Sequence, residues 1–262
     1  PPPPPPPPPP LFQAEDGIRD PPYSLVGSEM CIRDRLMVVA GCGTNSTTKS
    51  IENIKKAKEL GADAAMVVTP YYNKPTQEGL YAHFMKLADD GQLPLMLYNV
   101  PGRTGLNMQP GTVARLSQHD LIVAVKEASG SVEQMAEIIM LCGGKINLLS
   151  GDDAITYPIM TIGGTGVVSV SGNIIPKDIR AMITAIEKGD HDKARELHYK
   201  LLPFNQSMFI ETNPMPVKEA MNMLGMGVGN VRLPLVRMLP GNLVKLAAAL
   251  TDYGLELKNP PA

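Results

Sequence analysis

Lys126 is the residue whose type and position point most directly to chemistry. It follows the apolar run Ile122–Val125, so its amine begins inside a hydrophobic wall. Loss of hydration favours the neutral form of a buried ammonium group, and a neutral amine can attack a carbonyl carbon to form a Schiff base. The alternative is that Lys126 pairs with Glu127 or reaches solvent. Because successive strand residues point to opposite faces, we expect Glu127 to lie outside the pocket of the lysine.

Tyrosine and arginine side chains follow other apolar runs. Tyr98 follows Leu95–Leu97; a phenol there can transfer protons or pack in the core with one hydrogen bond. Arg103 comes shortly afterwards, and its guanidinium can hold a carboxylate through two hydrogen bonds or remain an exposed loop arginine. Tyr71 and Tyr72 form an aromatic pair on a loop, which favours a hydrophobic cover and an interface anchor about equally.

Other polar groups have simpler structural interpretations. Asp152 and Asp153 could bind a metal or act as acid–base carboxylates, but a role as caps of the following helix is simpler. The glycine-rich stretch 163–166 precedes a strand rather than following one, which indicates a turn instead of a phosphate site. The four histidines lie on expected helices and loops and join no cluster with metal-ligand spacing. We therefore expect no metal site.

The elements that position these groups are short apolar runs separated by helical patterns. The runs are continuous rather than alternating, as expected for parallel strands buried on both faces. Their ends recur at intervals of 20 to 30 residues, which is typical of βα units. Between them, Thr47 or Thr48 is the expected N-cap of one helix, and Thr76 that of the next. The runs are Leu36–Ala40, Ala64–Thr69, Pro94–Val100, Ile122–Val125, Ile146–Leu149 and Gly166–Val170.

Six such units predict an α/β protein with a TIM (β/α)₈ barrel. Residues 36–175 would supply strands 3 to 8 as a partial barrel, and residues 176–262 a C-terminal helical extension. A barrel closes only with eight strands, so we expect the first two βα units, ~60 residues, to be missing. An open doubly wound sheet is the alternative, but Gly41-Cys42-Gly43 lacks the third glycine of a dinucleotide-binding loop.

Residues 1–35 are interpreted as non-native sequence. Residues 1–10 are all proline, as a translated run of cytosines would be, and residues 13–20 and 29–35 back-translate to DNA that resembles sequencing-library adaptors. We expect this stretch to be disordered and exclude it from fold reasoning.

Composition excludes several classes of protein. The chain has 24 Lys and Arg against 26 Asp and Glu, and without residues 1–35 it keeps 21 of each sign. Such a balance argues against nucleic acid and anionic membrane surfaces as partners, and no apolar run approaches the ~18 residues needed to span a bilayer. Two cysteines remain outside residues 1–35, and no secretory signal is visible, which favours a cytoplasmic location.

Several motifs together resemble the dihydrodipicolinate synthase family. The resemblance covers essentially all of residues 36–262, and the lysine and tyrosine motifs alone indicate only the wider superfamily of pyruvate-dependent lyases. The Arg103 motif and residues 213–218 favour the synthase over sialic-acid lyase. The motifs are V-T-P-Y-Y-N (68–73), L-Y-N-V-P-G-R-T-G (97–105), V-K-E-A-S-G (125–130), L-S-G-D-D (149–153) and N-P-M-P-V-K (213–218).

The resemblance implies a class I aldolase-type barrel and a Schiff-base-forming lyase of lysine and diaminopimelate biosynthesis. Lys126 would form the imine with pyruvate, and the derived enamine would attack L-aspartate 4-semialdehyde to give 4-hydroxy-tetrahydrodipicolinate. Tyr98 would transfer protons, and Arg103 would hold the carboxylate of the semialdehyde.

The resemblance also implies a homodimer or homotetramer that uses no metal or organic cofactor. Tyr72 would complete a proton relay in the neighbouring subunit, while backbone groups near Gly151 and Val168 would line the lysine pocket. Two features depart from the family pattern. The Thr-Thr-Gly-Glu segment, whose threonine links the two tyrosines of the relay and helps bind pyruvate carboxylate, is absent, and Lys49 stands where lysine-inhibited members usually carry a glutamate.

Two other functions stay open. One is a related Schiff-base lyase acting on N-acetylneuraminate or 2-keto-3-deoxy-sugar acids. The other is a non-catalytic chain, either an interaction protein or an inactive fragment whose outer strands, Leu36–Ala40 and Gly166–Val170, expose edges that promote aggregation.

Overall fold

The computed structural model describes residues 36–261 of the chain. Residues 1–35, interpreted above as disordered adaptor sequence, lie outside the described residues, so that interpretation stays a prediction. The chain divides into two compact units, the first ending at Leu148 and the second beginning at Leu149.

Four parallel strands form the centre of the first unit. Each strand pairs with the next one in the chain, so that the strands are neighbours in sequence order. This arrangement confirms the predicted parallel strands and their order. The strands are β1 (Val39–Gly41), β2 (Ala64–Val68), β3 (Leu95–Asn99) and β4 (Ile122–Glu127).

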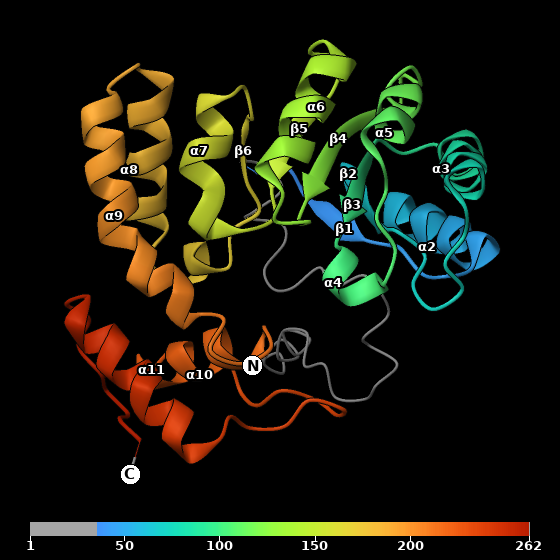
Figure 1. Ribbon diagram of the computed structural model, residues 1–262. Coiled ribbons are helices and arrows are strands. Elements are labelled where there is room, and N and C mark those ends of the chain that lie inside the picture. The colour runs from blue at the N-terminus through green and yellow to red at the C-terminus, as the bar shows by residue number, and fades with distance from the viewer. Residues whose placement is uncertain (1–35, 262) are drawn as a thin grey trace, which may run out of the picture. The chain divides into compact units, whose positions relative to one another are not determined.

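Helices follow each of these strands, and all but the one-turn helix after the third strand, which lies apart below them, flank the outer side of the strands (Figure 1). The expected cap of the second of these helices is confirmed, because the Thr76 hydroxyl accepts a hydrogen bond from the amide of Gly79. The expected cap of the first is wrong by one residue: Ser46, not Thr47 or Thr48, has the extended backbone of an N-cap. The helices are α2 (Thr47–Glu59), α3 (Gln77–Gly91), α4 (Pro101–Thr104), α5 (Pro110–Leu116) and α6 (Val132–Cys142).

The core of the first unit lies between the strands and these helices. Leu95 and Leu97 on β3 and Phe84 on α3 are completely buried. A β-bulge lies in the β3–β4 pair, where Leu95 is opposite Ile122 but Met96 is opposite Ala124. Beyond the bulge the two strands run in steady register to their carboxyl ends, and that register decides which side chains of the two strands face each other.

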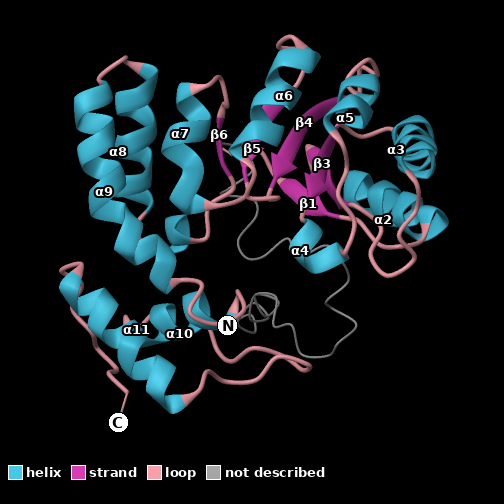
Figure 2. Cartoon of the chain, in the orientation of Figure 1, coloured by secondary structure: helices cyan, strands magenta, loops and turns pink. Residues whose placement is uncertain are grey.

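The second unit holds two short parallel strands and a set of helices. Strand β5 (Asn147–Ser150) crosses the boundary between the units and pairs with β6 (Gly166–Val167), which ends three residues earlier than predicted. Helices α8 and α9 run antiparallel side by side (Figure 2), in the stretch where the sequence predicts a helical extension. The helices are α7 (Thr156–Thr161), α8 (Pro176–Glu187), α9 (His191–Ser207), α10 (Met215–Met223) and α11 (Pro240–Asp252), with single 3₁₀ turns η2 (Asp153–Ile155) and η3 (Ser171–Asn173).

Apolar side chains from four of these helices form one cluster in the second unit. Met182, Leu201, Leu246 and Leu250 are completely buried there, and Phe204 is almost completely so. Parallel strands alternating with helices, followed by a helical extension, are the features of a TIM-barrel-type protein. Within residues 36–261, no helix has the length and apolar character needed to cross a membrane.

Candidate active site

Tyr98 and Lys126 stand next to each other at the ends of two adjacent strands. They are opposite partners in the β3–β4 register, and the Lys126 Nζ atom lies 4.0 Å from the centre of the Tyr98 ring. Burial raises the pKa of the Tyr98 phenol, and the positive charge of Arg103 opposes that rise. The structure therefore brings together an amine and a protonated phenol, the two groups that imine chemistry needs.

Arg103 lies in the one-turn helix α4, which sequence reasoning took to be a loop. Pro101 begins the helix, where a residue without an N–H is tolerated, and Gly105 ends it in the left-handed conformation. Arg103 is exposed, whereas the neighbouring Thr104 is buried and its hydroxyl donates to the carbonyl of Val100. This anchor leaves the guanidinium at the surface, close enough to influence the ionisation of Tyr98.

The tyrosine pair lies on the loop after β2. Tyr72 is 88% exposed and Tyr71 is 42% exposed, so neither ring belongs to the core of the described chain. Tyr72 has a left-handed backbone, with a φ of 72°. The side-chain amide of Asn73 donates to the carbonyl of Asn45 and so ties this loop to the loop after β1. An exposed ring on an anchored loop fits the interface role that the sequence left open.

Glu127 occupies the opposite face of β4 from Lys126, as expected. It is completely buried, and its carboxylate accepts hydrogen bonds from the Asn99 and Gln134 amides and from the backbone N–H of Ser129. Sequence reasoning assigned no role to Asn99 or Gln134. The available signal was their position: Asn99 directly follows Tyr98 as Glu127 directly follows Lys126.

In the second unit, Gly151 and Val168 lie just beyond the ends of β5 and β6. The Val168 amide donates to the carbonyl of Ser150 at 2.9 Å and continues the strand pairing past β6. Of the two adjacent carboxylates, Asp152 caps η2 by accepting from the amide of Ala154, which confirms the expected cap.

Asp153 does not have the helix-capping role that we expected. Its buried carboxylate accepts hydrogen bonds from the Ser169 hydroxyl and from the amides of Val170 and Ser171. Burial raises the pKa of Asp153, and these hydrogen bonds oppose the rise. Because the carboxylate ties down residues 169–171, the chain leaves the strand geometry after Val167, which explains why β6 is shorter than predicted.

A profile of the Dihydrodipicolinate synthetase family matches residues 26–252 of the chain. The chain belongs to this family. It is 53% identical over 224 residues to the 4-hydroxy-tetrahydrodipicolinate synthase of Citrifermentans bemidjiense, an alignment that covers 86% of this chain and 77% of the relative. The corresponding enzyme of Thermodesulfovibrio yellowstonii is 54% identical over the same coverage. The dihydrodipicolinate synthase structure from Aquifex aeolicus has a TM-score of 0.85 at 44% identity, covering 87% of this chain and 78% of that one.

Membership of the dihydrodipicolinate synthetase family agrees with the motifs that carried the resemblance. The family match begins at residue 26, ten residues inside the stretch interpreted as adaptor, and that interpretation remains a prediction. Among residues 36–261, no three His, Cys, Asp or Glu side chains are grouped as metal ligands.

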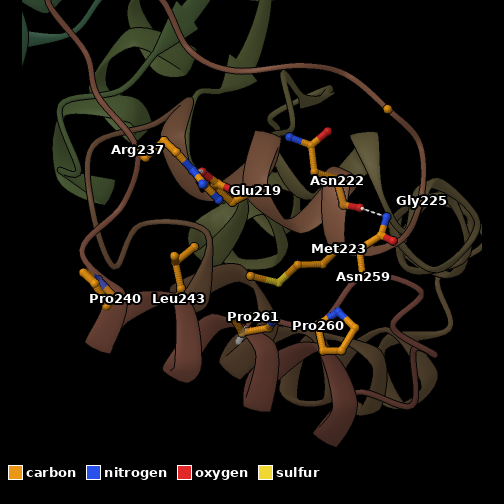
Figure 3. A pocket seen from close by; sticks show the side chains of 11 residues that line it. Glu219, Asn222, Met223, Gly225, Arg237, Pro240, Leu243, Asn259, Pro260 and Pro261 are labelled. Atoms are coloured by element: carbon orange, nitrogen blue, oxygen red, sulfur yellow. Dashed lines mark hydrogen bonds and ion pairs between the residues drawn. The ribbon is translucent and has the colours of Figure 1, made fainter.

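A cavity of about 590 Å³ lies within the second unit of this family member (Figure 3). The ion pair between Glu219 and Arg237, 3.2 Å long, lies at its wall, with Met223 and Leu243 among the apolar lining. None of the side chains predicted to do chemistry lines it. The cavity therefore contributes no support for the reaction at Lys126.

Proposed function

We propose that this chain is a 4-hydroxy-tetrahydrodipicolinate synthase that condenses pyruvate with L-aspartate 4-semialdehyde through a Schiff base on Lys126. The observation that carries the proposal is the Lys126 amine 4.0 Å from the centre of the Tyr98 ring, at the carboxyl ends of adjacent parallel strands. In barrels of this type, chemistry takes place at that end of the strands. The names of relatives at 52 to 54% identity support the same reaction.

Each residue has a defined role in the proposed reaction. The Lys126 amine attacks the keto carbon of pyruvate, and loss of water gives the imine. Removal of a methyl proton gives an enamine, whose carbon bonds to the aldehyde carbon of the semialdehyde. The phenol of Tyr98 holds a proton at neutral pH, as an ordinary phenol does, and burial raises its pKa further, so it first donates a proton to a reacting oxygen and then recovers one. The adduct cyclises and is released from the lysine.

The remaining site residues would bind substrates or complete the site. Arg103, exposed in α4, would grip the carboxylate of the semialdehyde. Tyr72, exposed on its loop, would enter the site of a neighbouring subunit in a homodimer or homotetramer. Backbone groups at Gly151 and Val168 would line the lysine pocket. The imine itself supplies the electron sink, so the reaction needs no metal or organic cofactor. A cytoplasmic location would suit such an enzyme.

The complete enzyme would carry two more βα units before residue 36. The described residues contain six parallel strands, an eight-stranded barrel needs two more, and the chain spans 77% of the length of its relative from Citrifermentans bemidjiense. The Thr-Thr-Gly-Glu segment would lie in those units. For experiments, we define the completed chain as residues 36–262 preceded by the N-terminal segment of that relative.

Borohydride trapping tests this function. The completed chain is incubated with pyruvate, reduced with borohydride and digested, and the modified peptide is identified by mass spectrometry. The reduced pyruvate adduct is expected on Lys126 and absent from exposed lysines such as Lys56. Modification elsewhere, or none, would refute the Schiff-base assignment. Turnover with sugar acids instead of the semialdehyde would favour the related lyases.

The chain as written, without those units, is expected to be poorly soluble and inactive because its outer strands have open edges. Robust turnover by the literal 262-residue chain would overturn this expectation.

A further inference from the structure

We propose that Glu127 is a positioning residue, which holds Tyr98, Lys126 and the Arg103 segment in their working arrangement through a buried polar cluster. The cluster consists of Asn99, Asn107, Glu127 and Gln134, and we call it the Glu127 cluster. The proposal rests on the proposed function, because it assigns to the Glu127 cluster the geometry of that same site.

The cluster joins strands β3 and β4 directly behind the two reacting side chains. In the register, Tyr98 is opposite Lys126 and Asn99 is opposite Glu127. The Asn99 amide donates to both carboxylate oxygens of Glu127, at 2.9 and 3.2 Å. Because successive residues of a strand point to opposite faces, a side-chain link between Asn99 and Glu127 fixes the alignment of Tyr98 and Lys126 on the other face.

This link compensates for an irregular start of the strand pair. A β-bulge near Leu95 shifts the pairing at the beginning of β3. A shift of one residue would exchange the two faces of a strand, which would turn Lys126 away from Tyr98. The side-chain bond between Asn99 and Glu127 holds the register at the far end, where the chemistry takes place.

The same cluster closes the segment that carries Arg103. The Asn99 side-chain oxygen accepts from the amide of Met108 at 3.0 Å, and its amide donates to the Asn107 oxygen at 2.8 Å. The chain between Asn99 and Met108, which includes Arg103 in α4, is thus pinned at both ends. The side chain of Gln134 on α6 pairs with the side chain of Asn107 through two hydrogen bonds, of 2.7 and 3.1 Å.

A charged group is required at position 127 because every partner of its carboxylate donates. Glu127 and Asn99 have no exposed surface and Gln134 is 9% exposed, so water cannot replace a lost partner. Hydrogen bonds to a carboxylate are about twice as strong as neutral ones. A glutamine at position 127 has the same shape but would direct an amide at other N–H donors, leaving buried donors without an acceptor.

The test compares Glu127→Gln with a matched control, Glu133→Gln, in the completed chain. Glu133 is exposed on α6 next to Gln134, and its substitution removes the same charge. For Glu127→Gln, we expect kcat and the rate of pyruvate trapping at Lys126 to fall about 100-fold, the effect of a displacement of roughly 1 Å in a reacting group. We also expect KM for the semialdehyde to rise severalfold through the Arg103 segment. For Glu133→Gln, we expect no change in these parameters.

Each rate is divided by the amount of Lys126 that borohydride traps after prolonged exposure. This normalisation corrects the rates for any difference in the amount of folded protein. A merely structural role would lower the melting temperature of Glu127→Gln but leave kcat and KM per trappable site unchanged, and that result would overturn the proposal. The double variant Asn99→Asp/Glu127→Gln exchanges donor and acceptor between the two strands. Its kcat is expected to be about tenfold or more above that of Glu127→Gln alone. Failure of this exchange to recover any activity in folded protein would also contradict the proposal.

The two proposals fail in different ways. If the unsubstituted completed chain traps no pyruvate, the proposed function is wrong. In that case, crystal structures of the parent and of Glu127→Gln still test the Glu127 cluster. We expect the Lys126–Tyr98 contact of 4.0 Å to be lost in the variant, and its persistence would refute the positioning role. A variant that does not fold is replaced by Gln134→Leu, which removes one donor and is expected to show a smaller effect in the same direction.

Discussion

Acid should destabilise this protein through His83, a buried histidine on α3. The His83 side chain is 6% exposed. Its Nδ1 atom lies 2.9 Å from the hydroxyl of Thr47, whereas its Nε2 atom is buried without a hydrogen-bond partner. A proton added to this ring would place a positive charge in a site that offers little to stabilise it. Burial therefore lowers the pKa of His83 from 6.5 to about 4.

The size of the effect follows from linkage between proton binding and folding. Between pH 6.5 and 4, the unfolded chain binds a proton at His83 and the folded chain does not, so stability decreases as the pH falls. One pKa unit corresponds to about 1.4 kcal/mol, and the whole shift to roughly 3 kcal/mol. The loss begins near pH 6.5 and is complete near pH 4. Above pH 6.5 the histidine is neutral in both states and contributes no pH dependence.

Urea unfolding of the completed chain at several pH values measures this contribution. The free energy of unfolding is compared between the parent and His83→Gln, because groups that titrate in both proteins cancel in the difference. The difference should change by roughly 3 kcal/mol between pH 7 and pH 4. As a control, Leu80→Ala removes a completely buried side chain of the same helix, and it should lower stability by about 2–5 kcal/mol at every pH. A pH-independent difference for His83→Gln would refute the reasoning.

Three further predictions concern the site and its surroundings. Lys126→Arg should abolish both pyruvate trapping and turnover in the completed chain while leaving far-ultraviolet circular dichroism unchanged; intact catalysis would exclude the imine mechanism. Asp153→Asn should lower the free energy of unfolding by about 1–3 kcal/mol, because an amide cannot accept all the hydrogen bonds from residues 169–171. Asp152→Asn, which keeps a good N-cap, should cost less than half as much. L-Lysine should inhibit turnover weakly or not at all, because Lys49 would meet its ammonium group with a like charge; a low half-inhibition concentration in an inhibition curve would contradict this.

Most strands could be located from the sequence because parallel strands buried on both faces leave continuous apolar runs. The run 64–69 became β2 over Ala64–Val68, and the run 94–100 became β3 over Leu95–Asn99. The run 166–170 failed because a long-range contact decides where its strand ends. The carboxylate of Asp153 binds the chain beyond Val168, and no local pattern reports that a side chain 16 residues away will do so.

The reacting residues of the candidate site could be predicted from the sequence, but the residues that support them could not. The identity of Lys126 and Tyr98 followed from motifs, and their alternation with Glu127 followed from strand geometry. The Glu127 cluster was not predictable in the same way, because Asn107 lies in a segment between helices and Gln134 on α6. In the sequence, such side chains cannot be distinguished from exposed polar residues. Only the folded path of the chain places them behind the strands. Buried polar clusters of this kind depend on tertiary structure, whereas buried strands depend mainly on local sequence.

The backbone conformation at Tyr72 affects which amino acids can replace it during evolution. A residue other than glycine in the left-handed region, here at a φ of 72°, costs about 1–2 kcal/mol. The ring recovers little of this within its own chain because it is 88% exposed. Glycine at this position would make an isolated subunit more stable and would delete the aromatic ring. In a gene copy under no selection for that ring, we expect substitutions to glycine or asparagine to accumulate at this position.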